Sequence, residues 1–207
     1  MSSLLTEVAL AVDPAPWMRL GVPVHGNRAQ FGRVRVRFGA AQHGLGLAVL
    51  HDRGLPHRID GVPTYNEDVP ATEPPPNGLG AIQIDHVVLA TPDLARTVEA
   101  FEQALRITVR RVRSEPTGSG ARLHQAFFRL GESILEVVGP PEVDPQYADL
   151  PAQLNGIVLS VLDLEGVCDR LGPDVVSAPK PAVQQGRHIA TVRKSAGLGL
   201  PVALLSA

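Results

Sequence analysis

The stretch Asp-His-Val-Val-Leu-Ala-Thr-Pro-Asp-Leu at Asp85–Leu94 returns, without a gap, as Asn-Gly-Ile-Val-Leu-Ser-Val-Leu-Asp-Leu at Asn155–Leu164, 70 positions later. An internal repeat of this kind indicates that one supersecondary unit occurs twice and that the copies build a fold together. The copies differ where chemistry would lie, because the first has His86 and the second has Gly156. We therefore expect the first copy to carry the polar groups of any site.

Each copy opens a longer pattern that predicts a strand, a helix and three further strands. In the first copy, the apolar strand Ile82–Ala90 precedes Asp93 as a helix cap, and apolar residues spaced three and four apart predict a helix from Leu94 to Leu105. Apolar runs separated by turn residues then predict the remaining strands. These are Ile107–Val112, Leu123–Leu130 and Ser133–Val138 in the first copy; in the second, strands Gly156–Val161, Val175–Ser177, Arg187–Val192 and Val202–Leu205 accompany a helix over Asp163–Leu171.

The chain before the repeats has a different character. Strand-like runs surround a short helical stretch at Trp17–Leu20, which suggests a third, degenerate copy. Arg33–Phe38 alternates arginine with apolar residues, which predicts a strand with a solvated arginine face. Arg53–Gly80 is rich in proline, which predicts an extended linker. The other two expected strands are Val8–Val12 and Leu45–Leu50, and the expected divisions are a degenerate β-rich segment (1–62), a Pro-rich linker (63–81), a first βαβββ unit (82–141) and a second (154–207).

Composition excludes several classes of partner. The 207 residues carry a net charge of −2, which gives no field to attract nucleic acid or an anionic membrane. The single cysteine, Cys168, excludes an intrachain disulfide, and we expect it to be a buried thiol without a role. The first twelve residues lack the basic stretch of a secretion signal. We expect a cytoplasmic protein with a small-molecule ligand and with no nucleic-acid or membrane partner.

Parity along two predicted strands places a histidine and a carboxylate on apolar faces. His86 shares its strand face with Ile84 and Val88, and Glu136 shares its own with Ile134. If these faces are buried, the Glu136 carboxylate needs a metal ion, an arginine or hydrogen bonds to offset its desolvation. The two groups are therefore the first candidates for a site.

The repeated unit, the strand-borne His86 and the Glu136 of Gly-Glu-Ser-Ile-Leu-Glu-Val-Val-Gly-Pro-Pro (Gly131–Pro141) together resemble the vicinal oxygen chelate superfamily. Its members include glyoxalase I, bleomycin-resistance proteins, methylmalonyl-CoA epimerase and extradiol dioxygenases. The resemblance covers residues 82–207 well and 1–62 weakly, and is closest to the glyoxalase-like branch. It implies an α+β fold of repeated βαβββ units that form curled mixed sheets. It also implies a homodimer.

In that superfamily, the first and last strands of two paired units hold a divalent metal ion inside a cup. The matching positions here are His86 and Glu136 in the first unit, and Gly156 and Leu204 in the second. The second pair has no ligand atoms, so the resemblance leaves two ligands for zinc, nickel, manganese, iron or cobalt. It also leaves open whether the units pair within one chain or between chains.

A third metal ligand would have to come from another strand or another subunit. His124 and His188 each lie in an alternating run that predicts a strand, so either is a candidate for the cup. Arg187 would then point to the side opposite His188, where a surface ion pair or an anion is expected.

Three functions remain open from the sequence. The first is a divalent-metal-dependent lyase, isomerase or dioxygenase acting on a small oxygenated molecule, with His86 and Glu136 as ligands. The second is a metal-free protein that binds or sequesters a small molecule, in which the metal site is degenerate. The third is a structural protein whose N-terminal segment blocks the cup. No residue is assigned a catalytic role, and no organic cofactor is expected.

Overall fold

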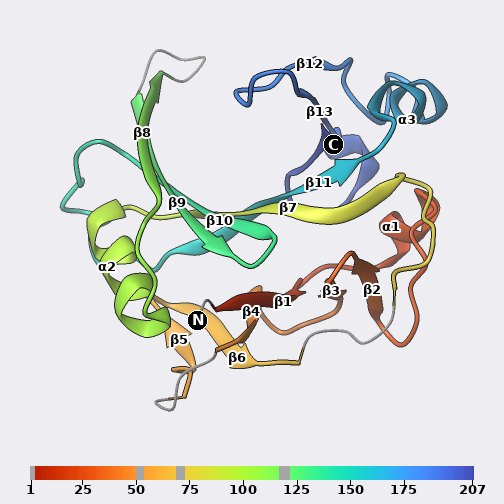
Figure 1. Cartoon of the computed structure of the whole chain (residues 1–207). Helices are drawn as coiled ribbons and strands as arrows, with labels where there is room; N and C mark the ends of the chain where they lie inside the picture. Colours follow the sequence, from red (N-terminus) through yellow and green to blue (C-terminus); the bar gives the residue numbers. More distant parts are fainter. Residues whose placement is uncertain (1–2, 50–53, 69–72, 117–121) are drawn as a thin grey trace.

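The structure, a computed structural model, describes residues 3–49, 54–68, 73–116 and 122–207. Two mixed sheets form two layers that share one hydrophobic core (Figure 1). The first layer is the N-terminal sheet, drawn in red and orange. Its elements are β1 (Leu4–Ala9), α1 (Ala15–Arg19), β2 (Arg28–Phe31), β3 (Val34–Arg37), β4 (Gly44–Ala48), β5 (Arg58–Ile59) and β6 (Val62–Asn66).

The second layer is an eight-stranded sheet built from the two repeats. Its strand order is β12-β13-β14-β11-β7-β10-β9-β8. The first unit comprises β7 (Ala81–Ala90), α2 (Leu94–Leu105), β8 (Arg111–Pro116), β9 (Arg122–Leu130) and β10 (Ser133–Gly139); the second comprises β11 (Gln153–Val161), α3 (Leu164–Leu171), β12 (Lys180–Pro181), β13 (His188–Thr191), a short 3-10 helix (Lys194–Ala196) and β14 (Val202–Ser206).

The two units pair through their first strands, within one chain. β7 lies antiparallel to β11, and in each unit the first strand is parallel to the last, β7 to β10 and β11 to β14. The outer strands bend away from the N-terminal sheet, so that β8 and the β12–β13 region rise on either side of the sheet centre (Figure 1). The predicted α+β fold of repeated βαβββ units in curled mixed sheets is confirmed.

The same aspartate of the repeat caps the helix in both units. The Asp93 carboxylate accepts a hydrogen bond from the Arg96 amide at 3.0 Å, and the Asp163 carboxylate accepts one from the Gly166 amide at 2.9 Å. The predicted helix from Leu94 to Leu105 is confirmed, because its cap and its apolar face are both local signals.

Two predicted strands are displaced. β8 begins at Arg111 instead of Ile107, because the chain leaves α2 through a left-handed Arg106 and the Val109 amide donates to the Glu102 side chain at 2.8 Å. In the second unit, Val175–Ser177 forms only an isolated bridge at Val176, and the paired strand is β12.

The N-terminal sheet has the order β2-β3-β1-β4-β6-β5. Its strands follow the same parallel and antiparallel pattern as strands β9-β10-β7-β11-β14-β13 of the larger sheet. In the N-terminal sheet, β1 is parallel to β3 and antiparallel to β4, and β4 is parallel to β6. The prediction of an extended linker over Arg53–Gly80 is wrong for part of this segment, because β5 and β6 lie within it. β1 also begins at Leu4, four residues before the predicted strand, and Leu50 at the end of another lies outside the described residues.

The arginine face of β3 is not simply solvated. Glu7 of β1 is fully buried and lies beneath it, and Arg37 Nε approaches Glu7 Oε1 at 2.6 Å. The Tyr65 hydroxyl donates to the same oxygen at 2.8 Å, and Arg35 Nε lies 3.7 Å from Glu7 Oε2. The arginines at 35 and 37 thus offset the desolvation of a buried carboxylate.

The single cysteine lies in the core, as predicted. Cys168 is buried, with 8% of its surface exposed, and burial raises the pKa of its thiol. Within the described part of the chain, no helix has the length and apolar character needed to cross a membrane.

Candidate functional site

A cavity of about 350 Å³ lies on the face of the eight-stranded sheet that points away from the N-terminal sheet. We call this cavity the cup. Its lining comes from seven strands and from the loop after β12: His86 (β7), Arg111 and Arg113 (β8), Gln125 and Phe127 (β9), Ile134 and Glu136 (β10), Val158 (β11), Ala182, Val183 and Gln184 (loop), Ile189 (β13) and Leu205 (β14).

The N-terminal segment does not block the cup. Every lining residue lies between positions 86 and 205, and the N-terminal sheet packs on the other side of the eight-stranded sheet (Figure 1). The expectation that the N-terminal segment covers the cup is therefore wrong for the described residues.

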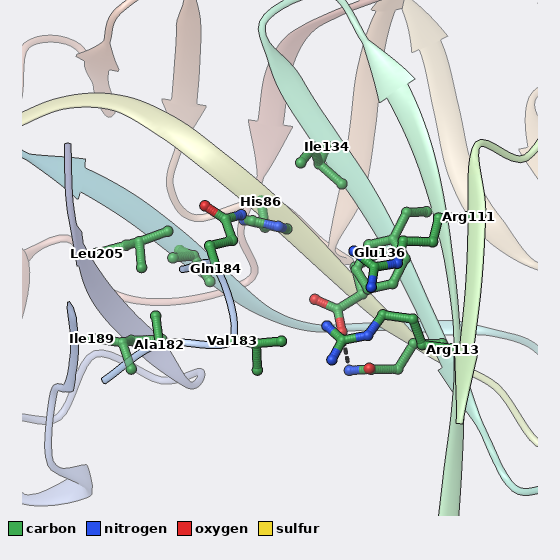
Figure 2. Close-up of a pocket in the computed structure, with 13 residues that line it drawn as sticks. His86, Arg111, Arg113, Ile134, Glu136, Ala182, Val183, Gln184, Ile189 and Leu205 are labelled. Atoms are coloured by element: carbon green, nitrogen blue, oxygen red, sulfur yellow. Dashed lines mark hydrogen bonds between the residues drawn. The ribbon is translucent and has the colours of Figure 1, made fainter. Parts of the chain in front are cut away.

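His86 and Glu136 both line the cup (Figure 2). The parallel register of β7 and β10 pairs His86 with Ile134 and Val88 with Glu136, so the imidazole and the carboxylate lie diagonally across two neighbouring strands. His86 is buried, with 8% of its surface exposed. Two polar groups from strands adjacent in the sheet thus converge on one sheltered space.

A β-bulge in β7 sets the direction of the residues around His86. The pairing with β11 shifts between Val158, which faces His86, and Leu159, which faces Ile84, so that Asp85 is the extra residue. Ile84 consequently lies on the opposite face of the sheet and is fully buried. The prediction that Ile84 shares a face with His86 is wrong, because strict alternation does not hold across a bulge.

Asp85 anchors the His86 ring. The Asp85 Oδ2 atom lies 2.5 Å from His86 Nδ1, in a close contact that lacks the direction of a hydrogen bond. Its other oxygen accepts hydrogen bonds from Ser160 Oγ and from the Arg187 guanidinium, both at 2.9 Å. This contact holds the Nδ1 side of the imidazole against Asp85, so Nε2 is the ring nitrogen that remains for a bound molecule.

The charge state of Asp85 follows from these contacts. Burial alone would raise the pKa of the Asp85 carboxyl, but His86, Arg187 and Ser160 together hold this pKa well below its usual range. Arg187, the residue before β13, contacts Asp85, so the partner of this predicted ion pair is a buried carboxylate instead of a surface one.

Glu136 has the opposite electrostatic balance. Burial raises the pKa of its carboxyl, and the lowering effects of His86, Gln125 and Arg113 do not cancel the increase. Gln125 Nε2 donates to Glu136 Oε1 at 2.7 Å, the contact drawn in Figure 2. Within the described residues, the Gln125 Oε1 atom is buried without a hydrogen-bond partner.

Sequence reasoning missed two arginines of the site. Arg111 and Arg113 project from β8 beside Glu136, as Figure 2 shows. Their spacing was the available signal, because residues two apart in a strand share a face. The predicted strand ended at Val112 and so did not place Arg113 in it.

The second unit contributes no ligand atom at the metal positions. The register of β11 and β14 pairs Val158 with Ala203, just as β7 and β10 pair Val88 with Glu136. Ala203 is therefore the counterpart of Glu136. The predicted counterpart, Leu204, is wrong: it is the next residue along β14, on the other face of the sheet, and is fully buried.

The two further histidines point away from the cup. Gln125 and Phe127 line it, so His124 lies on the opposite face of β9, where it is half-buried. Ile189 lines it, so the exposed His188 points elsewhere. The structure thus does not bring either predicted ligand to His86 and Glu136.

These residues do not fit a divalent ion held at the four positions of the fold. Only His86 and Glu136 offer ligand atoms there, and the guanidinium groups of Arg111 and Arg113 enter the same space, where they would repel a cation. Among the described residues, no three or more His, Cys, Asp or Glu side chains are grouped so as to hold a metal ion.

Comparison with known proteins gives a family match. Residues 83–190, just over half of the chain, match the model of the Glyoxalase/Bleomycin resistance protein/Dioxygenase superfamily. No curated protein matches the chain.

Similar solved structures include methylmalonyl-CoA epimerase from Mycobacterium tuberculosis (16% identity, 61% of this chain and 89% of that chain, TM-score 0.47). A Streptomyces coelicolor methylmalonyl-CoA epimerase variant in complex with 2-nitronate-propionyl-CoA has 19% identity, with 60% of this chain and 96% of that chain covered and a TM-score of 0.45. A hypothetical protein from Bacillus halodurans C-125 has 17% identity, with 60% and 94% covered and a TM-score of 0.48.

Proposed function

Because the chain belongs to the glyoxalase, bleomycin resistance protein and dioxygenase superfamily, we propose that it binds a small organic molecule in the cup without a resident divalent metal ion. One observation carries this proposal: at the two ligand positions of the second unit the chain has Gly156 and, by the register of β14, Ala203, which replaces the predicted Leu204. The volume of about 350 Å³ is within the range of small-molecule sites.

The residues of the cup have separable roles in this proposal. Val158, Ile189 and Leu205 supply an apolar surface that excludes water from a bound ligand. His86, oriented by Asp85, presents Nε2 to the ligand, and Glu136 is a carboxyl group whose pKa is raised by burial. A histidine and a carboxyl group with such an environment can hold or exchange a proton at a bound molecule.

A second candidate function is a divalent-metal-dependent lyase, isomerase or dioxygenase of the superfamily. The presence of His86 and Glu136 at the first-unit ligand positions favours it. Such a site would need further ligands from a second copy of the chain, and therefore a homodimer with cups that meet.

Metal analysis separates the two candidates. We expect protein purified without chelators or affinity metals to contain substoichiometric zinc, nickel, manganese, iron and cobalt by plasma mass spectrometry. We also expect titration with Zn²⁺ or Mn²⁺ to give the same weak response in the wild type, His86→Ala and Glu136→Ala. One metal ion per chain in the wild type that disappears in both variants would overturn the metal-free proposal and support the second candidate.

Ligand binding tests the cup itself. We expect phenylacetate, phenylacetamide, octanoate or octanamide to shift amide NMR signals of cup residues, and we expect Val158→Phe to reduce the shifts by filling the cavity. The matched control is Leu162→Phe, because Leu162 follows the same strand and is 74% exposed outside the cup. If none of these probes shifts a cup signal, the proposed binding function is wrong.

A further inference from the structure

We propose that the ligand of the cup is an organic anion, a carboxylate on an apolar body, whose charged end is bound by Arg111 and Arg113. This inference rests on the proposed binding function and narrows its ligand to one chemical class. It assigns to these arginines the principal role in ligand specificity.

The strand β8 presents both guanidinium groups to the same space. Arg111 pairs with Phe127 and Arg113 with Gln125 in the antiparallel β8–β9 ladder, and all four residues line the cup. Residues two apart on one strand face have Cα atoms about 7 Å apart, which lets two long arginine side chains reach a single carboxylate. Arginine is also the side chain whose planar fork matches a carboxylate with two hydrogen bonds.

The charges of the lining favour an anion. Arg111 and Arg113 contribute two positive charges, and Glu136 is the one carboxylate among the described residues of the lining. Asp85 is not part of the lining, and its charge is offset by Arg187. The positive field in the cup is thus local, because the whole chain carries a net charge of −2.

The cup is polar on one side and apolar on the other, which gives the ligand a direction. Figure 2 shows Arg111, Arg113 and Glu136 on one side and Ile189 and Leu205 on the opposite side. The side chains on the second side come from β13, β14 and the loop after β12, and all are apolar except Gln184. A ligand that satisfies both sides has a negative group at one end and a hydrocarbon body at the other.

His86 lies between the two sides, in the centre of the cup (Figure 2). A carboxylate that binds at β8 would therefore place the first atoms of its apolar body next to the His86 ring. Glu136 would lie close to the bound carboxylate and would oppose it electrostatically while it is ionised. This opposition gives the inference a distinctive test, because removing the Glu136 charge should strengthen binding.

Paired probes separate the charge from the body. We expect phenylacetate and octanoate to bind at least tenfold more tightly than phenylacetamide and octanamide, which have nearly the same shape and no charge. Arg113→Gln and Arg111→Gln should each weaken the acids about tenfold, the size expected for hydrogen bonds to a charged group, and leave the amides unchanged. Affinities are measured by calorimetry and NMR titration at constant salt.

Two further variants complete the experiment. Arg110→Gln is the matched control, because Arg110 is exposed, adjacent in sequence and outside the cup, and it should change neither class of probe. Glu136→Gln should tighten the binding of the acids about fivefold by removing the opposing charge. A Glu136→Gln variant that weakens the acids would contradict the assignment of the anion to this end.

The outcomes distinguish the inference from the function on which it rests. If acids and amides bind equally and the arginine variants bind both normally, the anion inference is wrong and the binding function stands. If no probe binds the wild type, both are wrong. Acids that are preferred but remain unaffected by Arg111→Gln and Arg113→Gln would place the anion elsewhere and overturn the inference.

Discussion

Replacing Arg187 by glutamine is expected to lower the free energy of unfolding by about 3 kcal/mol, because it leaves a buried carboxylate without its cationic partner. Arg187 donates to Asp85 at 2.9 Å and to Ser160 Oγ at 3.0 Å, and only 10% of the Asp85 side chain is exposed. The loss is measured by urea unfolding followed by far-UV circular dichroism. Arg129→Gln, a change at an exposed arginine of β9, is the control and should cost less than about 0.5 kcal/mol.

A double-mutant cycle tests whether the penalty belongs to Asp85. Asp85→Asn together with Arg187→Gln should recover part of the stability that Arg187→Gln loses, because the unpaired charge is then absent. If the double variant is less stable than Arg187→Gln by the full cost of Asp85→Asn, the two residues are not coupled and the explanation is wrong.

The same pair predicts a dependence of stability on pH. The folded-state pKa of Asp85 lies below the value in the unfolded chain, so its contribution is fully present above the unfolded pKa of about 4 and is lost as pH falls toward the folded pKa. Unfolding of the wild type between about pH 5 and pH 2 should therefore show a steeper loss of stability than unfolding of Asp85→Asn. Equal slopes would show that Asp85 is not held ionised by its neighbours.

The repeat and its local signals were sufficient to predict much of the fold. The Asp93 cap and the apolar face of α2 lie within one segment, so the helix was predicted with its true ends. Alternation along β10 likewise predicted that Glu136 shares a face with Ile134, and this holds because the strand has no bulge in its pairing with β7. Such features depend on neighbours in sequence, and for that reason a single sequence reveals them.

Other features depend on pairing between distant segments and were not predictable from one strand at a time. The bulge at Asp85 exists because β7 and β11 shift their register between Val158 and Leu159. The assignment of Ala203 in place of Leu204 follows from the register of β14 against β11. Alternation shows which residues of one strand share a face. It does not show which residues of the neighbouring strand lie on that same face, because this depends on the register between the strands.

The arginines of the cup illustrate the same limit. The sequence shows Arg111 and Arg113 at alternating positions, but the exit from α2 determines where β8 begins. That exit depends on the left-handed Arg106 and on the hydrogen bond between the Val109 amide and Glu102. Because the start of the strand was displaced by four residues, the arginines were not recognised as part of one face directed at Glu136.

Trp17 is the single tryptophan of the chain and a fully buried residue of α1, and its replacement by alanine is expected to cost about 4 kcal/mol. Its side chain is fully buried, and its ring centroid lies 5.6 Å from that of Phe38 and 6.4 Å from that of Phe31. The Trp17 Nε1–H group donates a hydrogen bond to the Leu198 carbonyl at 3.2 Å. Because Leu198 belongs to the second βαβββ unit, this one residue joins the N-terminal segment to that unit.

The effect of Trp17→Ala therefore reports how the two sheets depend on each other. If they unfold as one unit, the circular dichroism signal of both should disappear in a single urea transition, shifted to lower denaturant by the loss of about 4 kcal/mol. Trp17→Phe keeps most of the packing and loses the hydrogen bond to Leu198, so it should cost only about 1 to 2 kcal/mol. Met18→Ala, at a neighbouring position that is 53% exposed, should have little effect. A Trp17→Ala variant as stable as Met18→Ala would contradict this account, whereas two separate transitions would mean that the eight-stranded sheet keeps its cup without the N-terminal sheet.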